Sequence, residues 1–160
     1  NVQGDETLVP PKLIQQVAEC LSNHAVAKLA TACEKITNQD LLFSSDVVKV
    51  ILNKRGAAIY FSRAPIPWER DAFAEEPRQM KGVHYRHIGL YAYRVGFLAE
   101  YLSWDACCLG QMESLEQLRV LWHGYKIQCV ESLKPVPHGV DTAEDLTRVK
   151  KIMQNSKVAS

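Results

Sequence analysis

Two acidic residues, Asp5 and Asp141, stand where a divalent cation could be held. Asp5 follows Gly4 at the end of a short strand-like stretch, and ligands bind just past strand ends in open α/β sheets. Mg²⁺ takes one or two protein carboxylates and completes its octahedron with water and phosphate oxygens. The alternatives are an ordinary turn aspartate at Asp5 and, at Asp141 or Thr142, the N-cap of a helix. Their spacing in the sequence does not show whether the two carboxylates meet.

Arg63, His87 and Tyr91 are the next candidates for binding chemistry. Arg63 follows a predicted strand and precedes a proline-rich stretch, and a guanidinium there could grip a carboxylate or phosphate at two points. A surface ion pair is the other interpretation. His87 and Tyr91 are four residues apart on a predicted strand and therefore share one face. Whether that face lines a pocket or belongs to the core is left open.

Three polar residues, Glu113, Glu116 and Gln117, are expected on one side of a predicted helix. Such a side either binds a ligand or is simply solvated. The sequence contains no Gly-x-Ser-x-Gly elbow, no histidine and cysteine cluster with zinc spacing, and no glycine-rich phosphate loop. Because these motifs are absent, the sequence gives no support for a serine hydrolase, a zinc site or a glycine-rich phosphate site.

The elements that must position these residues alternate between helices and strands. Apolar periodicity predicts helices over 12–21, 95–104, 113–125 and after 141, strands over 26–33, 85–93 and 126–130, and a hairpin pairing 47–52 with 57–61. The charged stretch 69–81 is expected to be a loop, either a lid or simply solvated. This alternation predicts a three-layer α/β/α domain with a mixed, mostly parallel sheet.

Composition narrows the class of protein. The chain has 160 residues, 47% hydrophobic and 23% charged, with a formal net charge of +1. This balance gives no basic surface for nucleic acid, and no apolar run approaches the ~20 residues of a membrane span. The five cysteines lack metal-type spacing, so reduced thiols in a cytoplasmic protein are expected. Because the chain opens on what looks like the tail of a strand, we interpret it as the later part of a larger domain.

Five motifs, in order along the chain, resemble those of one family. They are Asn1-Val2-Gln3-Gly4-Asp5-Glu6, Tyr60-Phe61-Ser62-Arg63-Ala64-Pro65-Ile66-Pro67-Trp68, Arg86-His87-Ile88-Gly89-Leu90-Tyr91, Glu113-Ser114-Leu115-Glu116-Gln117-Leu118-Arg119 and Gly139-Val140-Asp141-Thr142. The family is 3-deoxy-manno-octulosonate cytidylyltransferase, the CMP-Kdo synthetase of Gram-negative bacteria. The resemblance extends from Asn1 to about Met153. It implies that residues 1–160 are the C-terminal part, the sugar-binding half, of a single nucleotidyltransferase domain.

This resemblance implies a nucleotide-diphospho-sugar transferase fold and an enzyme that transfers CMP from CTP to Kdo for lipopolysaccharide synthesis, with Mg²⁺ and as a cytoplasmic homodimer. Asp5 and Asp141 fall on the family's metal ligands, through which they take part in catalysis. The sugar-binding residues of the family fall on Gln3, Arg63, His87, Tyr91, Glu116 and Gln117.

The sequence departs from the family pattern at Thr7, where the family has a proline, and at Ser44-Ser45, which replaces an Asn-Pro. The family's first strand and its loop for the CTP phosphates have no counterpart in the chain. Two other readings stay open: a cytidylyltransferase for another acidic sugar, and an inactive, truncated fragment that binds sugar or mediates dimerisation.

Overall fold

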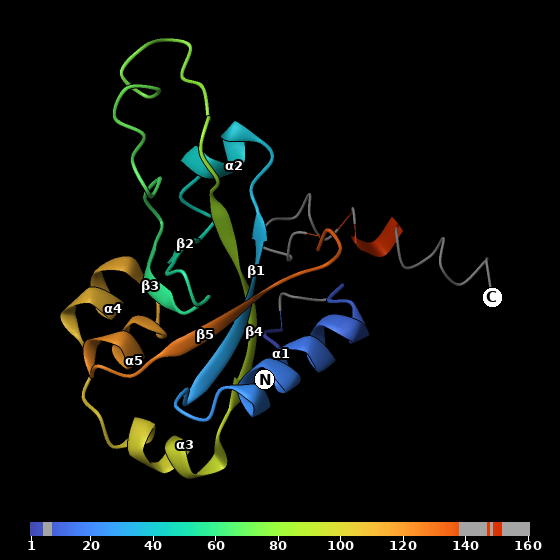
Figure 1. Ribbon diagram of the computed structural model, residues 1–160, viewed down its shortest axis with the longest axis vertical. Coiled ribbons are helices and arrows are strands. Elements are labelled where there is room, and N and C mark those ends of the chain that lie inside the picture. Colours follow the sequence, from blue (N-terminus) through green and yellow to red (C-terminus); the bar gives the residue numbers. More distant parts are fainter. Residues whose placement is uncertain (5–7, 138–146, 148, 152–160) are drawn as a thin grey trace.

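A five-stranded sheet forms the centre of the computed structural model, which describes residues 1–4, 8–137, 147 and 149–151 (Figure 1). Its strand order is β3-β2-β4-β1-β5. The strands are β1 (Leu29–Lys35), β2 (Lys49–Leu52), β3 (Ala58–Ser62), β4 (Tyr85–Tyr93) and β5 (Ile127–Glu131). The helices are α1 (Pro11–Asn23), α2 (Gln39–Phe43), α3 (Val95–Leu102), α4 (Cys108–Glu113) and α5 (Leu118–Trp122).

Helices cover both faces of this sheet, which confirms the predicted three layers. On one face α1 packs Leu13, Val17 and Leu21 against the small residues of β1 and the even-numbered residues of β4. The opposite face is covered by α3, α4 and α5, whose apolar residues join Phe61 and Tyr91 in a second core. Figure 1 shows α1 on one side of the strands and α4 and α5 on the other.

The sheet is mixed, as expected, but the predicted parallel majority does not hold for the described strands. Only β1 and β5 run parallel among them, whereas the pairs β1–β4, β2–β4 and β2–β3 are antiparallel. The reason lies in the connections: β2 and β3 form the predicted hairpin, and β4 enters the sheet against both neighbouring strands without a helical crossover, which parallel pairing requires.

The predicted helix over 113–125 is wrong, because the chain breaks between α4 and α5. Ser114 lies in the left-handed region, with φ 53° and ψ 49°, and caps α4 through its N–H to Gly110 O. Leu115 N also donates to Gly110 O, at 3.0 Å. The break directs both Leu115 and Leu118 into the core. Glu113 therefore ends α4, and Glu116 and Gln117 lie in the turn before α5.

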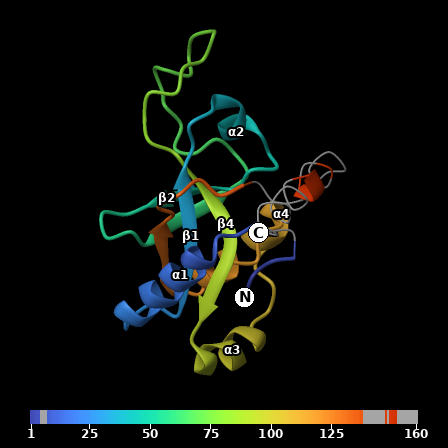
Figure 2. The same cartoon turned by 90° about the vertical axis from the view of Figure 1, so that its right-hand side faces the viewer.

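Beyond one end of the sheet, α2 and the loop from Arg63 to His84 form an arm (Figure 2). Phe73 is buried there with Leu42 and Ile36. The Glu69 carboxylate accepts hydrogen bonds from the backbone N–H groups of Lys81 and Gly82, and it pairs with His84 at 2.7 Å. The loop expected over 69–81 is therefore held closed at its base by one side chain.

The final helix predicted after Asp141 lies mostly outside the described residues. In the part of the chain that is described, no helix combines the length and apolar character that crossing a bilayer requires.

We predict that Glu69→Ala destabilises the arm. His84, only 1% exposed, would lose its carboxylate partner, and an unsatisfied buried polar group costs about 1–3 kcal/mol. Proteolysis between residues 70 and 80 should become faster, as measured by limited digestion. Glu75→Ala, on the exposed part of the same loop, is the matched control and should leave the rate unchanged. Equal digestion of both variants would contradict this role of Glu69.

Candidate functional site

The centre of the candidate site is one face of β4. The face that looks toward the layer of α3, α4 and α5 is formed by alternate positions of the strand, His87, Gly89 and Tyr91. The His87 ring lies edge-on to Phe61, with centroids 5.1 Å apart, and 5.4 Å from the ring of Tyr91. The sequence left open whether this face was pocket or core. The structure places it in the core: Tyr91 is buried, His87 is half-buried, and both rings pack among aromatic side chains.

His87 is held in its neutral form by its surroundings. Burial, and then the nearby Arg86 charge, lower its pKa from 6.5 to about 3. Its Nε2 lies 2.8 Å from Thr31 Oγ1. The Thr31 hydroxyl has a single hydrogen and lies within reach of two carbonyl oxygens, Leu90 O at 2.8 Å and Ile88 O at 3.2 Å. Because a carbonyl can only accept, we infer that the hydroxyl donates to one of them and accepts from Nε2–H. This assigns the proton to Nε2 and leaves Nδ1 as the acceptor of the ring.

Tyr91 and Glu116 lie within electrostatic reach of each other. Tyr91 is buried, and burial followed by the Glu116 charge raises its pKa well above the usual value of 10. The phenol therefore stays protonated and can donate a hydrogen bond. Glu116 is exposed at the edge of this face, and its backbone oxygen accepts from Tyr101 at 3.4 Å.

Gln3 reaches the same place from the other end of the chain. Residues 1–3 run antiparallel to β4: Val2 bridges Leu90, and Gln3 N donates to Gly89 O at 3.2 Å. The Gln3 side chain crosses over Gly89 so closely that a Cβ there would lie 2.0 Å from Oε1. Its Nε2 donates to Glu116 Oε1 at 3.1 Å. Gly89 is thus required by this close approach.

Gln117 is 2% exposed, and its Oε1 has no hydrogen-bond partner among the described residues. A buried amide oxygen that accepts no hydrogen bond costs free energy, which a donor brought by a ligand would recover. The atom is therefore a candidate acceptor for a ligand hydroxyl.

Arg63 is oriented by backbone carbonyls. Its Nε donates to Glu113 O and its Nη1 to Ser45 O, both at 2.9 Å. Within the described part of the chain no carboxylate oxygen comes within 4.0 Å of this guanidinium, so the alternative of a surface ion pair is not supported there. The arrangement fixes a positive charge whose remaining N–H groups can take an anion.

The two predicted metal ligands, Asp5 and Asp141, lie outside the described residues. Within the described ranges, no three side chains of histidine, cysteine, aspartate or glutamate come together as a metal site. The assignment of both aspartates stays a prediction.

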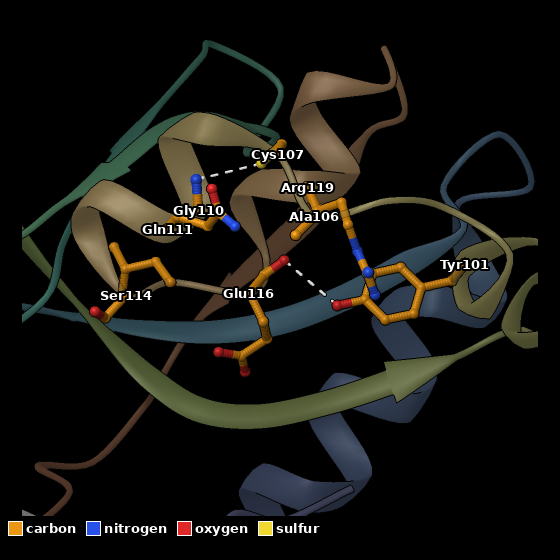
Figure 3. A pocket seen from close by; sticks show the side chains of 9 residues that line it. Tyr101, Ala106, Cys107, Gly110, Gln111, Ser114, Glu116 and Arg119 are labelled. Atoms are coloured by element: carbon orange, nitrogen blue, oxygen red, sulfur yellow. Dashed lines mark hydrogen bonds between the residues drawn. The ribbon is translucent and has the colours of Figure 1, made fainter.

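A cavity of about 350 Å³ opens beside the site, between α3 and the break that separates α4 from α5 (Figure 3). Glu116 belongs both to this cavity and to the predicted set. Arg119 and Tyr101 form another part of the wall, with the guanidinium 4.0 Å above the centre of the phenol ring. The cavity lies beside the predicted site, because Glu116 alone of the predicted residues lines it.

Sequence reasoning missed one residue and one contact. The residue is Thr31, which binds His87 but lies 56 positions away in the chain and reads as an ordinary strand residue. The contact is that of Glu113, which was expected on a common helical side with Glu116, whereas its carboxylate accepts from Ser62 Oγ at 2.6 Å and from Arg63 N at 2.9 Å. Donors and acceptor each stand in a family motif, but their pairing arises only in the fold.

Comparison with known proteins decides the family. The family model described as cytidylyltransferase matches residues 1–127. The chain belongs to the cytidylyltransferase family.

Curated members of this family are identical to this chain at about half of the aligned positions. A 3-deoxy-manno-octulosonate cytidylyltransferase of Coxiella burnetii (strain Dugway 5J108-111) is 56% identical over 93% of this chain and 60% of its own length. Another, from Tolumonas auensis, is 52% identical over 98% of this chain and 61% of its own length. The chain thus spans about three fifths of these cytidylyltransferases.

A solved structure agrees with the fold. The structure of a CMP:2-keto-3-deoxy-manno-octonic acid synthetase complexed with CTP matches with a TM-score of 0.85 and 34% identity, over 98% of this chain and 61% of that one. The resemblance to CMP-Kdo synthetases and the nucleotide-diphospho-sugar transferase fold are thereby confirmed.

We predict that His87 makes the cytidylyltransferase chain less stable in acid. Its pKa in the folded state, about 3, lies below the ordinary 6.5, so the unfolded state binds more protons between these values. The free energy of unfolding should fall as the pH drops below about 6.5, by up to about 1.4 kcal/mol per unit. Denaturant titrations at about pH 7 and about pH 5 measure this slope.

The slope should diminish in His87→Gln and persist in His24→Gln, which removes an exposed imidazole at the end of α1. An unchanged slope in His87→Gln would show that His87 is not held neutral.

Proposed function

We propose that the protein containing this chain transfers CMP from CTP to Kdo and releases pyrophosphate. The observation that carries the proposal is the guanidinium of Arg63, which is fixed by two carbonyls and forms no ion pair with a described carboxylate. Kdo is an acidic sugar, and its carboxylate suits this charge. The names of the relatives favour Kdo over another acidic sugar and over a module without activity.

The other predicted residues suit the hydroxyl groups of such a sugar. Glu116, Gln117 Oε1 and His87 Nδ1 provide acceptors, while the Tyr91 hydroxyl provides a donor. Gln3, bound to Glu116, holds that carboxylate in place. We infer that these groups orient the sugar so that its anomeric oxygen faces the α-phosphate of CTP. Such orientation replaces a costly bimolecular encounter.

In the proposed reaction the anomeric hydroxyl oxygen attacks the α-phosphorus, and the bond from that phosphorus to the oxygen shared with the β-phosphate breaks. Pyrophosphate leaves with the electron pair of that bond, and the hydroxyl proton is released to solvent. His87 is a poor base because its pKa is about 3. We therefore assign the described side chains to binding and orientation, and none of them to proton abstraction.

Mg²⁺ belongs to the proposal, with Asp5 and Asp141 as its protein ligands. Two carboxylates suit the ion, which would neutralise phosphate charge when bound. A cytoplasmic location and a homodimer are also proposed, on the basis of the family resemblance.

The test is pyrophosphate release by the full-length protein given CTP, Kdo and Mg²⁺. Arg63→Ala should raise KM for Kdo by about 10- to 100-fold, because a charge-assisted hydrogen bond contributes about 1.5–3 kcal/mol, and should leave KM for CTP unchanged. Asp5→Ala and Asp141→Ala should each abolish release.

The matched control is Arg55→Ala, in the exposed turn between β2 and β3, which should behave as the unaltered protein. No release from Kdo would refute the proposal, and release from a different acidic sugar at a higher kcat/KM would redirect it. Full activity in either aspartate variant would refute the metal assignment.

A further inference from the structure

Glu113, at the end of α4, contacts the end of β3 through all of its oxygens. Oε1 accepts from Ser62 Oγ at 2.6 Å and from Tyr60 OH at 3.5 Å. Oε2 accepts from Arg63 N at 2.9 Å, and the backbone oxygen accepts from Arg63 Nε at 2.9 Å. These contacts join segments about fifty positions apart in the sequence.

Glu113 and Arg63 bind each other reciprocally. The side chain of Glu113 holds the backbone of Arg63, and the backbone of Glu113 holds the side chain of Arg63. We call this pair of contacts the Glu113–Arg63 lock. Ser62, which is 2% exposed, adds to it, because its Oγ donates to Glu113 and also accepts from Ala64 N at 3.0 Å. Glu113 thus holds both the backbone of Arg63 and the Nε of its guanidinium, while Ser45 O holds Nη1.

The carboxylate achieves this without cancelling the charge of Arg63. Its oxygens are occupied by neutral donors, two hydroxyls and one backbone N–H, and no ion pair forms between the two side chains. On the other side, the buried Lys49 donates to Arg63 O. The guanidinium is therefore surrounded by carbonyls and keeps its charge for an anion.

Glu113 also lies just before the chain break that carries the sugar-facing residues. Ser114, in its left-handed conformation, connects Glu113 to the turn with Glu116 and Gln117. A fixed Glu113 therefore sets how far the guanidinium stands from the Glu116 carboxylate and the Gln117 amide.

We propose that Glu113 is a positioning residue that fixes Arg63, and with it the carboxylate end of the sugar, relative to Glu116 and Gln117. This inference rests on the proposed function. Glu113 does not touch the sugar; it acts through Arg63.

The test is a double-mutant cycle in the full-length protein. Glu113→Gln keeps the shape but replaces one acceptor oxygen by an NH₂ group, which cannot accept from Ser62 or Arg63 N. KM for Kdo should rise about tenfold, with KM for CTP within about twofold of the unaltered value. In the Arg63→Ala background the same substitution should add less than about twofold.

Two further variants complete the design. Glu131→Gln removes an exposed carboxylate at the end of β5 and should change neither constant. Ser62→Ala leaves the carboxylate in place but removes one donor, so it should raise KM for Kdo about threefold and serves if Glu113→Gln folds poorly. An unchanged KM in folded Glu113→Gln, or an undiminished effect in the Arg63→Ala background, would overturn the proposal.

A second readout does not depend on turnover. The ¹⁵N signal of Arg63 Nε–H should be visible and slow to exchange in the unaltered protein, because this group donates to the backbone oxygen of Glu113. In Glu113→Gln that oxygen remains, but the carboxylate no longer holds the two segments together, so the exchange of this N–H should become faster. If the unaltered protein fails to use Kdo, the proposed function falls, and this exchange rate alone decides whether Glu113 positions Arg63. An exchange rate unchanged by the substitution would overturn that role.

Discussion

The site depends on one constraint: the face of β4 that carries His87 and Tyr91 must be buried and polar at once. Pairing with β1 on one side, and with β2 and residues 1–3 on the other, satisfies the backbone of the strand. The polar side chains are then tolerated because each is neutral. Burial holds the imidazole deprotonated and the phenol protonated, so no uncompensated charge enters the core.

The charged side chains of the candidate site lie at the edge of this neutral face. Arg63 stands at the end of β3 with carbonyl partners, and the exposed Glu116 is held by Gln3. A molecule with a carboxylate at one end and hydroxyls at the other matches this distribution. The positions proposed to bind the sugar come from β4, the end of β3, the break before α5 and residues 1–3. These segments are distant in sequence, and the contacts Gln3–Glu116, Phe61–His87 and Arg63–Glu113 bring them together.

Local patterns in the sequence were sufficient for β4 and for the β2–β3 hairpin, because alternation and a glycine-bearing turn specify them. The break at Ser114 was not predictable, since a left-handed residue there is a serine rather than a glycine, and the apolar spacing continues across it. The Thr31–His87 contact and the Glu113–Arg63 lock could not be predicted from local patterns, because each joins residues that only the tertiary fold brings together. Gln3, Arg63, His87, Tyr91, Glu116 and Gln117 were named from family motifs, and their roles are proposals; Asp5 and Asp141 lie outside the described residues.

A fixed guanidinium without an ion-pair partner among the described residues should select an acidic sugar. Titration calorimetry of the full-length protein with Kdo and with its methyl ester, each in the presence of a non-hydrolysable CTP analogue, tests this most directly. The account predicts that the acid binds at least about tenfold more tightly than the ester, and that Arg63→Ala abolishes the difference. Equal affinities for acid and ester in the unaltered protein would contradict it.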